Sequence, residues 1–346
     1  MKMKWMILAG FLLLFAGCGG NEEADRCYKE GITAIEQGNY DSALSYFEQL
    51  IESGELLAEA YRGYGIAWME KGAYPEAIAA FSRSLNNLDG NHPKFKEDVM
   101  FYLAKMRIMT GELEKAVTVY SDMLKDNAEN VQAFFLRGKV YLEMKDFDNA
   151  QKDFDRALRD CKDYDLYINI YQLYANIGKS SQGEKYLDWA LELMPQTAED
   201  YYHRGRIYEN KGLYTQAKEV LVISRQLGFE ESTLLLGRIY LKLEDVSNAR
   251  KMYQNYLEQS KKKAVAYNGL AQCDIYEGNY DAALEHIQAG LLVGKEEELQ
   301  GLLYNEIVAY EYKKEFQIAK EKMASYLEKY PDDEDALREN EFLSTR

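Results

Sequence analysis

The segment Ala58–Asn87, AEAYRGYGIAWMEKGAYPEAIAAFSRSLNN, carries the pattern that decides the fold. Its first half places large and small residues on one face of a helix, at Tyr61, Tyr64, Gly65 and Trp68. Gly72 then ends this helix, and Pro75 stands where a second helix begins. In the second half an apolar residue recurs every four positions, at Ala77, Phe81 and Leu85. The segment therefore predicts an antiparallel helical hairpin that buries one side and needs a neighbour.

The same hairpin pattern recurs along the chain. Aligned on the small position of the first helix, the nine copies are marked by Gly31, Gly65, Ala104, Gly138, Tyr171, Gly205, Gly237, Ala271 and Ile307, spaced by 32 to 39 residues. The small position of the second helix follows twelve residues later, at Ala43, Ala77, Ala116, Ala150, Gly183, Ala217, Ala249, Ala283 and Ala319. A fixed period of this length indicates a stack of identical units, because one hairpin alone cannot bury its apolar face.

This pattern resembles the tetratricopeptide repeat, over about residues 24–331. The family's small, aromatic, Ala and Pro positions appear here as Gly65, Trp68, Ala77 and Phe81 in the second copy and as Ala190 and Pro195 in the fifth. The resemblance implies an all-α fold, a right-handed α-solenoid of about nine helical hairpins whose first helices line a concave groove. Residues 332–346 then fit a C-terminal capping helix with a polar outer face.

Several positions depart from the repeat. Tyr171 and Gly183 exchange size between the two small positions of the fifth copy, so we expect them to face each other. The segment Asp89–Pro93 lengthens the turn before the third copy. Arg107 and Asp274 occupy a position that is usually aromatic, and we expect the packing around both to be looser or locally shifted.

The amino terminus has the form of a secretory signal. Met1–Lys4 is basic, and the apolar run Trp5–Phe15 is too short to span a hydrocarbon core of roughly 30 Å. Leu14–Cys18 resembles the lipobox of bacterial lipoproteins, with Phe15 in place of the usual Leu. The resemblance implies a signal peptide over residues 1–17, acyl chains on Cys18 as the mature N-terminus, and a lipidated tether over 18–23. The alternative is an ordinary secretory signal with a chance cysteine.

Two or three acyl chains give stable anchoring where one is marginal. We therefore expect a lipid-anchored protein on the extracytoplasmic face of a bacterial membrane, either the outer leaflet of the cytoplasmic membrane or the outer membrane. The chain has 346 residues, a formal charge of −16 and a pI of about 4.9. That charge argues against nucleic-acid partners and against attraction to anionic lipid head groups.

The sequence points to no catalytic or cofactor chemistry. Its three histidines, His92, His203 and His286, have no metal-site spacing, and there is no Gly-rich phosphate loop or nucleophile elbow. The cysteines that follow Cys18 are three in number and widely spaced, so we expect no disulfide framework. We expect a non-catalytic protein without cofactors or a metal.

Two rows of first-helix side chains are expected to point into the groove. One row is mostly apolar and includes Phe101, Phe135, Tyr202 and Leu234. One helical turn later the second row carries four cations, Lys105, Lys139, Arg206 and Arg238. Aromatic anchors beside Lys or Arg suit an extended peptide with apolar and acidic side chains. The alternative is that the apolar row packs between helices and that the cations are solvated or paired with nearby carboxylates. An acidic row at the helix starts, which includes Asp98, Asp165 and Glu199, is explained by the helix dipole.

These observations predict a lipid-anchored scaffold that binds a protein or peptide partner in its groove. A more specific alternative is an envelope-assembly factor of the kind that helps build outer-membrane barrels or pilus secretins. An extracytoplasmic enzyme is a third alternative from another class. The sequence does not identify the partner.

Overall fold

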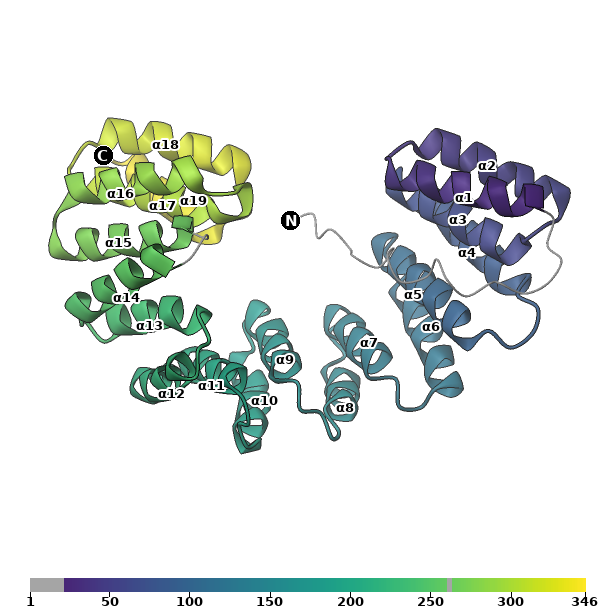
Figure 1. Ribbon diagram of the computed structural model, residues 1–346, viewed down its shortest axis with the longest axis horizontal. Helices are drawn as coiled ribbons and strands as arrows, with labels where there is room; N and C mark the ends of the chain where they lie inside the picture. The colour runs from purple at the N-terminus through teal and green to yellow at the C-terminus, as the bar shows by residue number, and fades with distance from the viewer. Residues whose placement is uncertain (1–21, 260–262) are drawn as a thin grey trace. The chain divides into compact units, whose positions relative to one another are not determined.

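The computed structural model describes residues 22–259 and 263–346, which divide between two compact units, Met1–Cys161 and Lys162–Arg346. The N-terminal unit contains four helical hairpins (Figure 1). Their helices are α1 (Glu22–Glu36) and α2 (Tyr40–Ser53), α3 (Leu57–Glu70) and α4 (Tyr74–Asn86), α5 (Pro93–Met109) and α6 (Leu113–Asp126), and α7 (Val131–Glu143) and α8 (Phe147–Ala157).

The C-terminal unit contains five hairpins and a final helix (Figure 1). Its helices are α9 (Tyr164–Asn176) and α10 (Ser180–Glu192), α11 (Ala198–Asn210) and α12 (Tyr214–Gln226), α13 (Glu231–Lys242) and α14 (Val246–Gln259), α15 (Lys263–Glu277) and α16 (Tyr280–Val293), α17 (Gln300–Tyr312) and α18 (Phe316–Lys329), and α19 (Glu334–Ser344). A short 3₁₀ turn, η2 (Glu296–Glu298), precedes α17. In the described residues the prediction of an α-solenoid of nine hairpins plus a last helix is confirmed.

Hairpins stack on their neighbours within each unit. Within each unit, each helix contacts the next one along the chain. First helices of adjacent hairpins also touch in the pair α1 and α3 and throughout α9, α11, α13, α15 and α17. The buried clusters follow this order and combine residues of adjacent hairpins, such as Tyr253 and Leu270 in one cluster. This is the arrangement expected of units that bury their apolar faces only against each other.

The turn inside each hairpin contains one residue in the left-handed region. These residues are Gly38, Gly72, Gly111, Lys145, Gly178, Gly212, Glu244, Gly278 and Lys314. Glycine adopts this conformation without steric cost, whereas Lys and Glu carry a Cβ that is disfavoured there. Gly72 ends the first helix of its hairpin as expected, and Pro75 lies in the first turn of α4.

The small residues of the first helices make room for large rings. A Cβ atom added to Gly31 would lie 2.7 Å from Cζ of Phe47, and one added to Gly65 would lie 2.7 Å from Cε1 of Phe81. In both cases the ring comes from the second helix of the same hairpin. Each glycine is therefore needed less for backbone contact than to seat the buried ring of the partner helix.

The structure tests two of the departures from the repeat, the pair Tyr171 and Gly183 and the residue Asp274. A Cβ atom on Gly183 would lie 3.2 Å from Cδ2 of Tyr171, so the expected exchange of size is confirmed. Packing is not looser at Asp274, which is 3% exposed, but the contacts there differ from those of the other copies. Its Oδ1 accepts a 2.8 Å hydrogen bond from Nη2 of Arg250, and its Oδ2 lies 2.6 Å from Nδ1 of His286. A buried carboxylate partnered by the guanidinium of Arg250 and the imidazole of His286 replaces the usual aromatic ring, because a partnered charge can be buried where a single one cannot.

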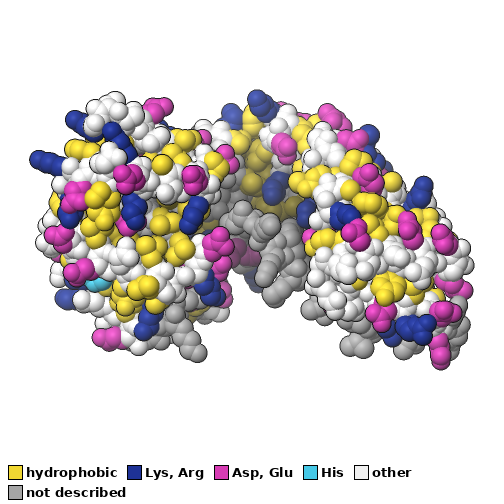
Figure 2. Space-filling model, turned by 90° about the horizontal axis from the view of Figure 1, so that it is seen from above, with side chains coloured by type: hydrophobic (Ala, Val, Ile, Leu, Met, Phe, Trp, Pro, Cys, Tyr) yellow, Lys and Arg dark blue, Asp and Glu magenta, His cyan; other side chains and the backbone are white. Residues whose placement is uncertain are grey.

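Charged side chains of both signs are interspersed over the face seen in Figure 2, with apolar side chains between them. Cys27, Cys161 and Cys273, the three cysteines of the described part, form no disulfide with one another. Burial raises the pKa of Cys273 to about 12, so its thiol stays protonated and behaves as a small apolar group.

Candidate partner-binding surface

In the N-terminal unit the predicted groove residues lie on α5 and α7. Phe101 and Phe135 are half-buried, and each packs its ring on the large residue of the second helix in its own hairpin. The ring centroids lie 6.4 Å apart for Phe101 and Tyr120, and 6.1 Å apart for Phe135 and Phe154. Both phenylalanines therefore contribute to the core with one part of the ring and remain accessible with another.

The two lysines of this unit follow one turn after the rings. Lys139 is exposed, and its Nζ lies 5.9 Å from the ring centroid of Phe135, within the range of a cation–π contact. Lys105 is half-buried on α5. The structure thus places a ring and an ammonium group together on α7, as the row spacing predicts.

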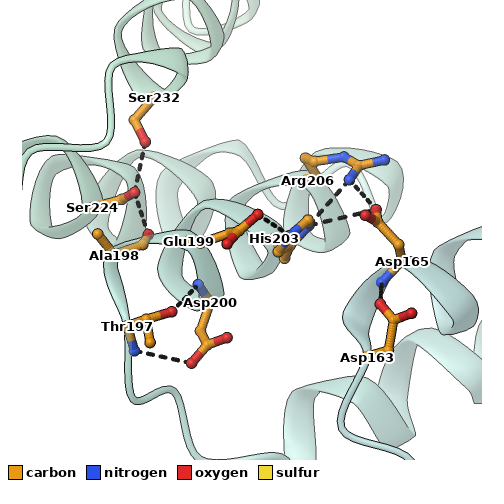
Figure 3. Close-up of polar contacts among 10 residues, drawn as sticks. All are labelled: Asp163, Asp165, Thr197, Ala198, Glu199, Asp200, His203, Arg206, Ser224 and Ser232. Atoms are coloured by element: carbon orange, nitrogen blue, oxygen red, sulfur yellow. Dashed lines mark hydrogen bonds and ion pairs between the residues drawn. The ribbon is translucent and has the colours of Figure 1, made fainter. Parts of the chain in front are cut away.

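In the C-terminal unit the predicted residues lie on α11 and α13, and the two arginines already have carboxylate partners. Arg206 pairs with Asp165 at the start of α9 (Figure 3). Arg238 donates to Glu209 from Nε and Nη2, at 2.6 and 2.7 Å. Burial lowers the pKa of Arg238, but the hydrogen bonds and charge of Glu209 outweigh this effect and leave the pKa raised. Their charges are thus compensated within the unit.

A histidine lies at the centre of this pairing. His203 is 12% exposed in its side chain, with Nδ1 3.1 Å from Nη1 of Arg206 and 3.6 Å from Oδ1 of Asp165 (Figure 3). Its Nε2 lies 3.8 Å from Oε1 of Glu199, one turn earlier on α11. The ring stacks on Tyr164, with centroids 5.9 Å apart and planes inclined by 7°. The cluster ties α9 to α11 through polar contacts.

The helix starts beside this cluster are capped by their own side chains. The hydroxyl of Thr197 accepts a 3.1 Å hydrogen bond from the backbone N–H of Asp200, and the Asp200 carboxylate accepts from the backbone N–H of Thr197 at 2.9 Å (Figure 3). This reciprocal arrangement satisfies free donors at the start of α11. Nearby, Ser224 donates to the carbonyl oxygen of Ala198 at 2.5 Å. The segment that carries His203 and Arg206 is therefore held in place at its N-terminal end.

Sequence reasoning missed the second role of the acidic row. Asp165 binds Arg206, and Asp98 accepts a 2.5 Å hydrogen bond from Nε of Arg62 in the preceding hairpin. Helix-dipole preference alone does not explain these contacts. These ion pairs could have been predicted from the sequence, because each arginine of a groove row has an acidic residue about one repeat away.

The remaining apolar positions on this side are half-buried. The ring of Tyr202 lies 5.0 Å from that of Phe229, and Leu234 packs at the edge of the cluster around Tyr253. Burial raises the pKa of Tyr202, so its hydroxyl stays neutral and can serve as a donor. The role of these residues in binding stays a prediction.

The predicted lipidation residue, Cys18, lies outside the described residues, as do the signal peptide and most of the tether. The first described helix begins at Glu22. Within residues 22–259 and 263–346, no helix is both long and apolar enough to cross a bilayer. The same residues contain no group of three or more His, Cys, Asp or Glu side chains that could hold a metal ion.

Two models of one repeat family match the chain. A model described as "Tetratricopeptide repeat" matches residues 28–93 and 234–295, and a second model with the same description matches 131–159 and 198–222. Together these segments cover more than half of the chain.

Known proteins with similar sequences are much longer. The chain is 21% identical over 272 residues to "Protein CTR9 homolog" of Arabidopsis thaliana, which covers 75% of this chain and 25% of that protein. It is 24% identical over 204 residues to "TPR repeat-containing protein MJ1428" of Methanocaldococcus jannaschii, which covers 55% of this chain and 34% of that protein. The chain thus spans a quarter to a third of the length of these relatives.

Among solved structures, yeast Tom70 superposes with a TM-score of 0.50 at 18% sequence identity. The match covers 87% of this chain and 67% of that one. At this identity the similarity shows the fold alone.

Proposed function

The chain belongs to the tetratricopeptide-repeat family, and from this premise we propose that it is a non-catalytic scaffold, anchored by lipid on Cys18 at the extracytoplasmic face of a bacterial membrane. It binds an extended segment of a protein partner on the first-helix rows. Repeats of this family generally serve protein–protein interaction. The location and the anchor rest on the amino-terminal sequence alone.

The anchor is supported by the order of three features. A basic start, an apolar run of about eleven residues and the small-small-Cys segment Ala16–Cys18 follow each other directly. Helix α1 begins only four residues after Cys18. An acyl-anchored chain with so short a tether holds its first hairpin close to the lipid surface.

One observation supports the assignment of the binding surface to the first helices. The row Phe101, Phe135, Tyr202 and Leu234 touches the core but keeps part of each side chain accessible in both units. Half-buried rigid rings are suited to anchor a partner, because they lose little side-chain entropy on binding. Exposed Lys139 supplies positive charge for acidic side chains of the partner. Arg206 and Arg238 pair with Asp165 and Glu209 within the chain.

Site-specific photocrosslinking tests the surface. p-Benzoylphenylalanine at position 135 or 202 of the full chain should crosslink one discrete partner in membranes of the source cell. The same reagent at Lys152 or Glu219, exposed positions on the second helices α8 and α12, serves as the matched control. Equal crosslinking from both pairs of positions would contradict the assignment to the first-helix rows.

A charge variant tests the exposed lysine separately. Lys139→Glu should weaken capture of that partner at least threefold and leave the melting temperature nearly unchanged. Lys152→Glu, at an exposed position on the second helix α8, is the matched control. Reversing Arg206 or Arg238 is a poorer test, because it would place a second carboxylate beside Asp165 or Glu209 and destabilise the fold.

The anchor has its own test. The full chain should incorporate labelled palmitate and fractionate with membranes, whereas Cys18→Ser should lose the label and appear in the soluble fraction. A Cys27→Ser variant should behave like the unchanged chain, because Cys27 lies within α1. Recovery of an unlabelled mature protein with free Cys18 would overturn the lipid anchor.

A further inference from the structure

A cavity of about 480 Å³ opens in the C-terminal unit between α15, the turn that follows it, and α17. In Figure 1 these helices lie next to each other in the C-terminal unit, and α15 contacts α17 directly. Among the lining residues, Tyr276, Tyr280 and Tyr312 provide the rings and Gln272 and Asn305 provide amides. The volume is within the range of sites that bind small molecules or single side chains.

The aromatic lining is unusually accessible. Tyr276 and Tyr312 expose 54% and 59% of their surface, although the other large apolar side chains of α15 and α17 are mostly packed. Tyr280 stacks on Tyr312, with centroids 5.5 Å apart and planes inclined by 8°. Stacking fixes the orientation of both rings. Ring faces carry partial negative charge and attract cations within about 6 Å of their centroids.

Glu277 is the one formally charged residue among those that line the cavity. Nη2 of Arg250 donates to its Oε2 at 2.8 Å, and Nδ2 of Asn279 lies 3.4 Å from the same oxygen. These contacts hold the carboxylate in place, and 40% of the Glu277 side chain remains exposed to a ligand.

The arginine does not fully neutralise this site. Arg250 also donates to Oδ1 of the buried Asp274 at 2.8 Å, so one guanidinium is shared between two carboxylates. His286 bonds to the other oxygen of Asp274. The pair Asp274 and Glu277 with Arg250 therefore keeps a net negative charge whenever His286 is neutral.

From these contacts we propose that the cavity binds the side chain of a lysine or arginine carried by a basic segment of the protein partner. The ammonium or guanidinium group lies against the rings of Tyr276 and Tyr312 and pairs with the carboxylate of Glu277. Gln272 and Asn305 supply hydrogen bonds to the backbone that carries it. The chain's net charge of −16 favours the approach of a basic segment.

Only the statement that the cation belongs to a protein rests on the proposed function. The chemistry of the cavity is independent of it, and it differs from that of the lysine-bearing rows on α5 and α7, which suit acidic side chains.

The test uses the full chain in a neutral detergent and two matched probes, N-acetyl-arginine methylamide and N-acetyl-citrulline methylamide. Citrulline has nearly the shape of arginine without its charge. Ligand-observed NMR should show the arginine probe binding in the millimolar range and at least fivefold more tightly than the citrulline probe. Equal affinity of the two probes would overturn the proposal in favour of a neutral ligand.

Variants locate the probe. Glu277→Gln and Tyr312→Ala should each weaken arginine binding at least threefold, and Tyr312→Phe should retain it because the ring remains. Leu292→Ala is the matched control, since Leu292 is 85% exposed on the neighbouring helix α16 and does not line the cavity. Unchanged melting temperatures separate loss of binding from loss of fold. If Glu277→Gln binds the probe as well as the unchanged chain, the assignment is wrong.

The outcome is distinguishable from that of the proposed function. Failure of crosslinking at positions 135 and 202, with the arginine probe still bound, would remove the partner-binding rows and leave the cation site in place. The reverse result would leave a scaffold without a cation site.

Discussion

Single residues set the tightest limits on this fold where a glycine of a first helix faces a ring of the second. At Gly138 an added Cβ would lie 2.6 Å from Cε1 of Phe154, which is fully buried. Gly138→Ala should therefore lower the free energy of unfolding by about 1–3 kcal/mol, although alanine favours helices elsewhere. Urea unfolding measures the change.

A double-mutant cycle shows whether the ring is the cause. In a Phe154→Leu background, Gly138→Ala should cost at least about 1 kcal/mol less than in the unchanged chain. Equal costs in the two backgrounds would mean that the backbone of α7, rather than the ring, sets the size limit at position 138.

Another residue-scale feature is the carboxyl group of Glu311 on α17. Burial, together with the charge and hydrogen bond of Glu339 on α19, raises its pKa to about 7. Between its ordinary value and about 7 the folded chain then holds a proton that the unfolded chain has released, so stability falls as pH rises through this window. Glu311→Gln should stabilise the protein by about 1 kcal/mol at pH 8, after allowance for partial exposure, and hardly at pH 5.

Urea midpoints at the two pH values provide the measurement. Glu328→Gln, an exposed position on α18, is the matched control and should change stability equally at both values. A gain for Glu311→Gln that is the same at pH 5 and pH 8 would show that the pKa of Glu311 is not raised.

At the scale of the helical elements, the turn inside each hairpin carries the clearest prediction. Six of the nine left-handed positions are glycine, but Lys145, Glu244 and Lys314 hold φ angles of 62°, 60° and 64°. A residue with a Cβ loses about 1 kcal/mol in this region. Lys145→Gly and Glu244→Gly should therefore each raise stability by about 0.5–1 kcal/mol, less a small entropic cost.

The two gains should add, because the turns lie in different units and share no partner. Gly72→Ala is the opposite control and should destabilise by a similar amount, since its φ is 78°. Calorimetry measures both. A loss of stability on introducing glycine at 145 would mean that the lysine side chain contributes more than the strain removes.

The helices themselves were predictable, and these turns were not. The apolar spacing recurs nine times, so the repeat could be identified even where single positions depart from it. The copy marked by Tyr171 and Gly183 was therefore placed correctly. Lys145, Glu244 and Lys314 gave no turn signal, because none of these residues favours the left-handed region. The ion pairs of Asp98 and Asp165 join different hairpins, and a helix-by-helix interpretation could not find them.

At the scale of the whole molecule, stability should reflect the number of stacked hairpins. Deletion of residues 198–230, the hairpin of α11 and α12, should leave a folded chain with a lower melting temperature and a smaller denaturant m-value. Deletion of α11 alone is the control and should disrupt the fold, because α12 then lacks its hairpin partner. An unchanged melting temperature after the full deletion would contradict a stack held together by neighbours.

The candidate sites were only partly predictable at this scale. Row spacing placed Phe135 and Lys139 side by side, because both lie on one helix. The cavity at Tyr276 and Tyr312 was not predicted, since a void depends on how side chains from α15, α16 and α17 fill the space between them. The sequence motif at Cys18 is local, and its lipidation stays a prediction.

The ring of Phe47 also meets the next hairpin. An added Cβ on Gly63 of α3 would clash with it, as one on Gly31 of α1 would, and Tyr253 stands in the same relation to Gly237 and Gly269. Each of these rings therefore needs a glycine on both of the first helices that it contacts. The equivalent position is not always glycine, because Tyr102 stands two residues before Ala104 in α5, whereas Gly63 stands two residues before Gly65 in α3. Hairpins of this protein are consequently not interchangeable parts. A hairpin that recombination moves to another position fits there only if the next hairpin has a glycine that accommodates its ring.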